Sequence, residues 1–98
     1  MIKALITAYI ASCYGCSGIT FSGLKADYRK NMISADLNYY DIGDKICLFL
    51  EGLENKCLTF TVYDTGGAIK GPNRFDMLVS DYHTAIEFGK KYLYYSKL

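Results

Sequence analysis

The sequence has no tryptophan, one proline and one histidine, and its formal net charge at pH 7 is only +1. So small a charge produces no long-range field, which argues against a dedicated nucleic-acid-binding protein. No apolar run approaches the roughly 20 residues of a membrane-spanning helix, so we expect no membrane span. The sequence also lacks a cluster of acids with histidine that would bind a catalytic metal, and we expect neither a metal nor another cofactor.

The balance of residue types indicates a folded domain. Hydrophobic residues make up 51% of the chain and charged residues 21%, which excludes intrinsic disorder. A length of 98 residues fits one domain, near the lower end of what buries a self-sufficient core. The first nine residues are too short and too interrupted for a signal peptide, so we expect no export signal.

Six short apolar or alternating runs, separated by glycines, predict six β-strands. They are rich in β-branched and aromatic residues, and the ten tyrosines suit strands as well as sugar stacking. Six strands and one helix in so short a chain predict a small all-β barrel, because barrel closure removes exposed sheet edges. The runs cover residues 2–10, 32–37, 45–50, 57–63, 74–79 and 91–97.

One helix is expected before the last strand. Ser80 or Asp81 can cap its first turn, and Gly89 can end it. His83 falls in the first turn, where we expect it to cap or pack the helix rather than to act in catalysis. The apolar stripe of this helix would consist of Tyr82, Ala85, Ile86 and Phe88.

The four cysteines leave several interpretations open. Without an export signal the default is reduced thiols, whereas an oxidising environment would allow Cys47 and Cys57 to pair across a hairpin. Cys13 and Cys16 have the spacing of a redox pair but lack the βαβ context and a suitably placed proline. All four could hold zinc, although the second pair lacks the CxxC spacing. We favour structural or free thiols.

The most informative segment runs from Asp64 to Asp76. One acid precedes the Gly66-Gly67 turn, where glycines permit positive φ, and the other lies on the returning strand, so we expect the two carboxylates to face each other across the loop. Because neighbouring carboxylates repel, one tends to keep its proton at neutral pH, as a general acid must. A phosphate-binding loop is excluded, because the Walker spacing, a Ser or Thr after Lys70 and a following helix are all missing. On spacing alone, a glycine-rich β-turn flanked by acids is an equal interpretation.

This segment resembles the signature of the three-aspartate (3D) domain family. The central match is Asp64-Thr65-Gly66-Gly67-Ala68-Ile69-Lys70-Gly71 followed by Asn73-Arg74-Phe75-Asp76. The family is related to the catalytic barrel of membrane-bound lytic transglycosylase A. The resemblance therefore implies one domain over residues 1–98, folded as a six-stranded double-psi β-barrel with a glycan groove. Further blocks match in order at residues 7–9, 18–23, 33–36, 42–45, 51–52, 85 and 88–89.

The resemblance implies cleavage of peptidoglycan by lytic transglycosylation. The three aspartates of the family fall on Asp36, Asp64 and Asp76. In the related enzymes the aspartate at the position of Asp76 is the sole acid/base. It protonates the oxygen between MurNAc and GlcNAc, then takes the proton of the MurNAc C6 hydroxyl as that oxygen attacks C1. The product is a 1,6-anhydro sugar, and no second base is needed to activate water.

Other residues receive supporting roles from the same resemblance. Asp64 would tune Asp76 and bind the sugar, and Asp36 would brace the groove. Lys70 could donate to an acetamido or lactyl oxygen, whereas Tyr9 and Thr20 could line the groove or belong to the core. The expected glycan-binding set is Asp36, Thr65, Gly66, Gly67, Lys70, Thr20 and Tyr9.

A barrel of this kind does not by itself determine activity. The alternatives are a non-catalytic module that binds or loosens the cell wall and a component of a phage tail tip. The expected partners are peptidoglycan glycan strands, and an association with phage virion or tail proteins stays open. Without an export signal we expect a protein that acts on the wall after phage delivery, as part of a virion, or as a fragment of a larger secreted protein.

Overall fold

The computed structural model describes residues 2–11, 18–50 and 56–98. Each of the six predicted strand regions forms a strand, and the second ends at Ser34 rather than at residue 37. A short 3-10 helix, η1 (Tyr28–Lys30), precedes the second strand, and one α-helix, α1 (Tyr82–Phe88), precedes the last. The strands are β1 (Ile2–Tyr9), β2 (Met32–Ser34), β3 (Lys45–Leu48), β4 (Leu58–Asp64), β5 (Arg74–Leu78) and β6 (Lys91–Lys97).

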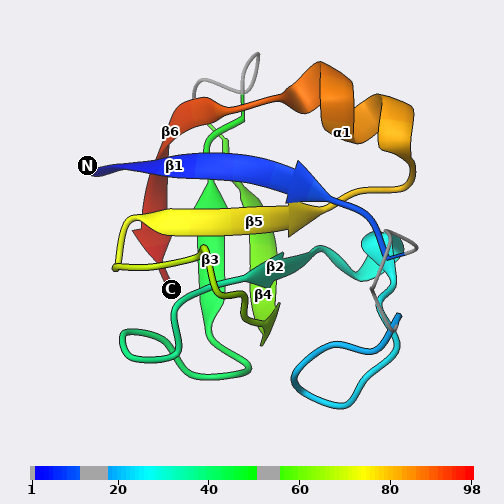
Figure 1. Cartoon of the computed structure of the whole chain (residues 1–98). Helices are drawn as coiled ribbons and strands as arrows, with labels where there is room; N and C mark the ends of the chain where they lie inside the picture. The colour runs from blue at the N-terminus through cyan, green and yellow to red at the C-terminus, as the bar shows by residue number, and fades with distance from the viewer. Residues whose placement is uncertain (1, 12–17, 51–55) are drawn as a thin grey trace.

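The strands close into a barrel in the order β1-β5-β2-β4-β3-β6. The pairs β1/β5 and β2/β4 are parallel, and the other neighbours are antiparallel. In Figure 1, β1 and β5 run side by side in the same direction, while β3 and β4 cross behind them. Around the barrel, strands of the first half of the chain (β1, β2 and β3) alternate with strands of the second half (β5, β4 and β6). If β1 is exchanged with β4, β2 with β5 and β3 with β6, every strand keeps the same set of neighbours, so the two halves are arranged equivalently. The predicted double-psi β-barrel is confirmed.

Side-chain alternation along the strands separates an apolar interior from a mixed outer face. In β1, Ala4 and Ile6 are buried, and in β5, Phe75 and Met77 are buried. Successive side chains of a strand point to opposite faces, so Asp76 lies on the outer face between two core residues. The remaining strand residues of the core cluster are Ile33, Ile46, Leu48, Phe60, Val62 and Leu93.

An aromatic cluster holds the start of β5 in place. The ring of Phe75 is fully buried, and its centroid lies 5.3 Å from that of Tyr40 and 5.2 Å from that of Tyr95. The hydroxyls of both tyrosines donate to the backbone oxygen of Pro72, at 2.5 Å from Tyr40 and 3.3 Å from Tyr95. Because Phe75 directly precedes Asp76, this cluster also fixes the backbone that carries the carboxyl group.

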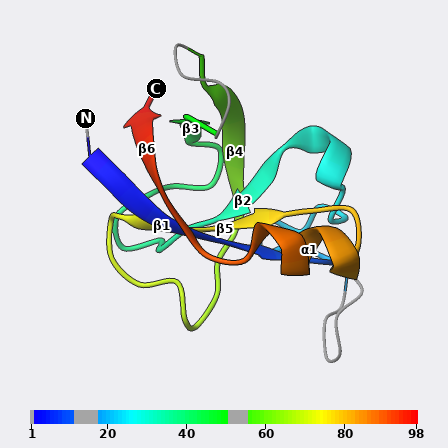
Figure 2. The same ribbon diagram turned by 90° about the horizontal axis from the view of Figure 1, so that it is seen from above.

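Helix α1 begins and ends as the sequence predicts. The side chain of Asp81 accepts a hydrogen bond of 2.8 Å from the Thr84 amide, and Gly89 ends the helix with φ of 64°. Figure 2 shows α1 beside the C-terminal end of β1, which it contacts.

The surface of α1 differs from the expectation. Tyr82 and Ile86 are 68% and 61% exposed, whereas Phe88 packs partly against the core. A seven-residue helix lying on the outside of a small barrel covers it with one edge only, so the predicted stripe is not buried. His83 neither caps nor packs, because its Nε2 lies 2.9 Å from Oε1 of Glu87 on the exposed side of the helix.

No helix among the described residues is long and apolar enough to cross a membrane.

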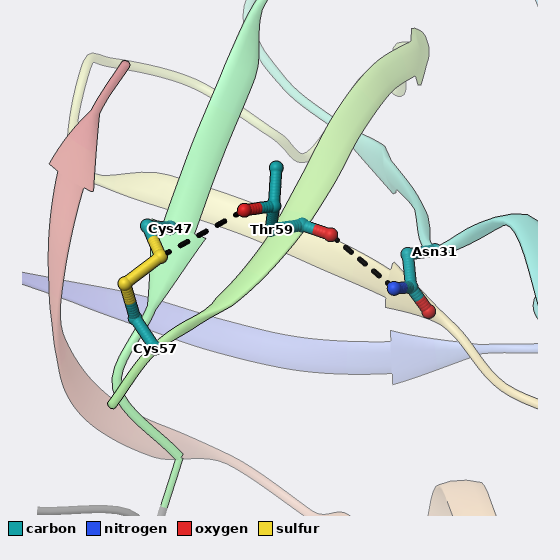
Figure 3. The surroundings of a disulfide bond; sticks show 4 residues. All are labelled: Asn31, Cys47, Cys57 and Thr59. Atoms are coloured by element: carbon teal, nitrogen blue, oxygen red, sulfur yellow. Dashed lines mark hydrogen bonds between the residues drawn. A yellow bond between two sulfur atoms is a disulfide. The ribbon is translucent and has the colours of Figure 1, made fainter. Parts of the chain in front are cut away.

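Cys47 of β3 and Cys57, just before β4, form a disulfide (Figure 3). Their Cα atoms are 5.2 Å apart, and the Thr59 hydroxyl donates to the Cys47 sulfur at 3.9 Å. The pairing considered for an oxidising environment is confirmed, and the default expectation of reduced thiols is wrong for this pair. A zinc site built from all four cysteines is excluded in this state, because disulfide sulfurs are not thiolates. Cys13 and Cys16 lie outside the described residues.

Removing this disulfide should destabilise the fold. It joins residues 10 apart in sequence, and the lost constraint on the unfolded chain is worth about 2–3 kcal/mol for so short a loop. We expect the Cys47→Ala/Cys57→Ala variant to lose that much unfolding free energy in urea titrations. Thr59→Val, which removes only the hydrogen bond to sulfur, is the control and should change much less. Equal unfolding free energies of the double variant and the wild type would contradict the prediction.

Candidate functional site

A row of polar residues crosses four neighbouring strands of the barrel. Thr7 of β1 is in register with Asp76 of β5, Asp76 with Ser34 of β2, and Ser34 with Asp64 at the end of β4. A register shift after Ile33 places Asp64, rather than the residue before it, opposite Ser34. Side chains in register on adjacent strands are neighbours, so the row gathers two carboxyls and two hydroxyls.

Asp76 is half-buried, and its environment favours the protonated form. The Thr7 hydroxyl donates to Oδ1 of Asp76 at 2.9 Å. Burial raises the pKa of Asp76 above its ordinary value, while the hydrogen bond from Thr7 and the charge of Arg74 oppose the rise. Repulsion from Asp64 adds the smallest contribution. The sequence predicts a raised pKa of one carboxyl through repulsion between two neighbouring carboxylates, but burial is the main cause of the rise at Asp76.

Asp64 does not face Asp76 across a hairpin loop, because β2 lies between β4 and β5. Its Oδ1 accepts hydrogen bonds of 2.9 Å from the backbone amides of Phe21 and Thr65. Its Oδ2 lies 3.5 Å from the Tyr9 hydroxyl, which donates to it. Asp64 therefore ties the end of β4 to the end of β1 and to the turn that contains Phe21.

Tyr9 lies at the centre of this arrangement. Burial, with added repulsion from the charges of Asp64 and Asp76, raises the pKa of Tyr9 to about 12, although a hydrogen bond with Ser34 opposes the rise. The phenol thus stays protonated at neutral pH and can donate a hydrogen bond. Of the two interpretations open from the sequence, groove or core, the structure places Tyr9 beside the carboxyl groups.

Asp36 lies outside the row and supports the glycine-rich loop. It is buried, and its two oxygens accept hydrogen bonds from the amides of Gly71 at 2.9 Å and Asn38 at 3.0 Å. These bonds, the one from Gly71 foremost, lower the pKa of Asp36, and the charge of Lys70 contributes. Gly71 has φ of 90°, a backbone conformation that is strained for residues with a side chain. Glycine is therefore required where the loop meets Asp36.

The other predicted glycan-binding residues, Thr65, Gly66, Gly67 and Lys70, belong to the loop that directly follows Asp64. Gly66 and Gly67 do not adopt the positive φ that the sequence suggested for this turn. A Cβ on Gly66 would nevertheless lie 3.3 Å from the Ile69 side chain, which is tighter than ordinary contact. The Thr65 amide is bound to Asp64, and the Lys70 side chain is exposed. Glycan binding by these residues stays a prediction.

Thr20 is buried, and its hydroxyl is used within its own turn. It bonds the backbone oxygen of Leu24 at 3.0 Å and lies 2.6 Å from the Ser22 hydroxyl. The structure thus gives Thr20 a place in shaping the turn, and direct contact of Thr20 with a ligand stays a prediction.

Thr7 and Ser34 are site residues that the sequence analysis did not single out. Thr7 bonds Asp76, and Ser34 is in register with both Asp64 and Asp76. The two-residue spacing of Thr7 and Tyr9 in a strand could have placed them on one face. Which strand lies beside that face, however, depends on the barrel order.

A small pocket opens beside the row, between the end of β1 and the segment that precedes η1. Its volume is about 120 Å³. Among the described residues, no group of three or more His, Cys, Asp or Glu side chains is arranged to hold a metal. The pocket is lined by Tyr9, Ile10, Ala11, Gly18, Ile19, Ala26 and Asp64.

The fold and the site define a double-psi barrel with an aspartate-centred site that includes the end of β4 and the middle of β5. Residues 31–98 match the model of the 3D domain, and the chain belongs to the 3D domain family. It is 38% identical over 87 residues to the Bacillus subtilis protein named "Putative cell wall shaping protein YabE", and 37% identical over 87 residues to the "Cell wall-binding protein YocH" of the same organism. Each alignment covers 87% of this chain, which spans 20% and 28% of the lengths of these two relatives.

The hydrogen bond from Thr7 should hold down the pKa of Asp76. We expect Thr7→Val to raise that pKa further, because the bond favours the charged carboxylate. The carboxyl carbon of Asp76 can be followed by NMR through a pH titration. Thr84→Val, on the exposed helix α1, is the control and should leave the titration unchanged. An unshifted midpoint in Thr7→Val would rule out this electrostatic role.

Asp76 should cost the protein stability at neutral pH. Since folding raises its pKa, the folded state binds the proton more tightly, and stability is lost as pH rises from 3.8 through the raised pKa. Above the raised pKa, Asp76→Asn should therefore have a larger unfolding free energy than the wild type. The difference between the two proteins should shrink as the pH falls toward 3.8.

Asp36→Asn should change the pH dependence of stability in the opposite direction. Folding lowers the pKa of Asp36, so its stabilising contribution is present above 3.8 and is lost as pH falls through the lowered value. Urea unfolding of the three proteins on both sides of pH 3.8 measures both effects. A pH-independent difference between Asp76→Asn and the wild type would contradict the assignment.

Proposed function

We propose that this domain cleaves peptidoglycan glycan strands by lytic transglycosylation, with Asp76 as the single acid/base. The observation that carries the proposal is the half-buried carboxyl of Asp76, whose pKa is raised by burial and whose Oδ1 is held by Thr7. A carboxylic acid whose pKa is raised above its ordinary value and which is held in a fixed orientation meets the main requirements of a general acid.

The reaction needs one group that gives and then takes a proton. Asp76 donates its proton to the glycosidic oxygen as the bond from that oxygen to C1 of MurNAc breaks. The C6 oxygen of the same sugar forms a new bond to C1, and its proton passes to the Asp76 carboxylate. The acid is regenerated, no water is consumed, and the product carries a 1,6-anhydro ring. An intramolecular attack gains from proximity and requires no second carboxylate across the sugar.

The neighbouring groups suit binding and support rather than proton transfer. The Tyr9 phenol, with its pKa at about 12, stays protonated and donates a hydrogen bond to Asp64 at the edge of the site. Two backbone amides occupy one oxygen of Asp64, so this side chain is better suited to holding the groove together than to activating water. Thr65, Gly66, Gly67 and Lys70 would contact the strand from the loop, with Asp36 bracing that loop through Gly71.

The relatives support a function at the cell wall. One is named for cell wall shaping and the other for cell wall binding. The second name is also consistent with an alternative candidate function, in which the domain holds the glycan without cleaving it. The two functions differ in whether Asp76 is needed for product formation and not merely for binding.

Asp76→Asn should abolish turnover and leave folding and glycan binding largely intact. The amide keeps the shape of the side chain but cannot transfer a proton, and losing acid/base catalysis typically costs about 10²–10⁴-fold in rate. Mass analysis of digested, purified peptidoglycan should find anhydro-muropeptides with the wild type only. Asp81→Asn is the matched control, because Asp81 caps α1 and asparagine caps equally well.

Digestion in ¹⁸O-labelled water tests the attacking group. MurNAc ends without label are expected, because the C6 oxygen attacks C1. Labelled reducing ends would instead make the domain a hydrolase in which Asp64 or Asp36 activates water. If the wild type binds peptidoglycan but forms no product, the result would contradict cleavage and support the wall-binding function instead.

A further inference from the structure

The turn formed by residues 20–24 presents large apolar side chains to solvent next to the candidate site. Phe21 is 65% exposed and Leu24 is 46% exposed. An exposed phenyl ring loses the free energy that burial would provide, about 1.5–3 kcal/mol for a full side chain. Exposed apolar side chains in contact with a polar site are typical of ligand-binding surfaces.

The turn is rigid enough to hold these side chains in a fixed place. The Thr20 amide donates to the Leu24 oxygen at 2.8 Å, and the Gly23 amide donates to the Thr20 oxygen at 2.9 Å. The buried hydroxyl of Thr20 adds bonds to Ser22 and Leu24. Gly23 has φ of 88°, which closes the turn in a conformation that suits glycine.

The same turn is attached to the aspartate row. The Phe21 amide donates to Oδ1 of Asp64 at 2.9 Å, and the Ser22 amide donates to the Tyr63 oxygen at 3.0 Å. In Figure 1 the turn lies beside the C-terminal end of β4. The phenyl side chain of Phe21 thus begins two bonds from the nitrogen that Asp64 holds.

The pocket beside the row indicates how a ligand would lie. Its volume of about 120 Å³ is below the roughly 300–1,000 Å³ of sites that enclose a whole ligand. A glycan strand would therefore run across the surface and place at most a substituent in the pocket. Its sugar rings have apolar faces, which aromatic rings can cover.

We propose that Phe21 is a stacking platform for a sugar ring of the bound glycan strand, on the Asp64 side of Asp76. The inference rests on the proposed function for its ligand, a peptidoglycan glycan strand. Phe21 makes no proton transfer and contributes binding and position. Its loss should therefore raise KM more than it lowers kcat.

The test measures binding without cleavage. Full-length Asp76→Asn protein is sedimented with purified peptidoglycan, alone and combined with Phe21→Ala, Phe21→Tyr or Tyr92→Ala. Tyr92 is the control, because it is an aromatic residue that is 69% exposed on β6, a strand that contributes no residue to the row. We expect Phe21→Ala to raise the dissociation constant roughly two- to tenfold, the effect of one aromatic contact, and the other two variants to match the parent. Circular dichroism checks folding, which an exposed position should preserve.

A second arm identifies the part of the polymer that Phe21 contacts. Strands freed of their stem peptides with an amidase should show the same loss of binding in Phe21→Ala. A loss seen only with peptide-bearing material would overturn the proposal in favour of a stem-peptide contact. Equal binding by Phe21→Ala and its parent, or equal weakening by Tyr92→Ala, would also overturn it. Failure of the parent to bind any peptidoglycan would instead refute the proposed function, so the two failures are distinguishable.

Discussion

The position of β2 between β4 and β5 is the constraint on which the site depends. Chain order alone suggests that β4 and β5 form a hairpin, with Asp64 and Asp76 as neighbours. The barrel instead inserts β2, which is parallel to β4 and antiparallel to β5, and sets Ser34 between the two carboxyls. Two strand spacings separate the backbones by roughly 10 Å. This separation explains why repulsion by Asp64 contributes least to the raised pKa of Asp76 and why burial dominates.

The same residue type serves three purposes because each aspartate has different surroundings. Asp36 accepts two backbone hydrogen bonds, which favour its charged form and make it a support for the loop. Asp64 binds the amides of Phe21 and Thr65 and joins separate segments. Asp76 accepts a bond from one hydroxyl and is desolvated, which favours its protonated form. Environment rather than residue identity therefore separates the candidate acid from its supports.

Features that depend on local sequence were predictable, and features that depend on long-range pairing were not. Strand alternation and the Asp81 cap are local patterns, and the structure places strands and helix accordingly. The exposed face of α1, however, depends on how far the barrel curves away from the helix. Thr7 and Ser34 join the site only through their register with β5. Their hydroxyls carry no local mark of function, because threonine and serine are common in strands and turns.

The candidate acid sits on a strand, and this couples the chemistry to the barrel core. Alternation along β5 points Phe75 inward, between Tyr40 and Tyr95, and turns Asp76 outward toward Thr7. The tyrosine hydroxyls also bind the backbone of Pro72, so packing and hydrogen bonding together set where β5 begins. Sites built on strands are held more precisely than sites on loops. In the proposed mechanism a single acid/base serves two proton transfers in one turnover and would need that precision, because no second carboxylate would compensate for its displacement.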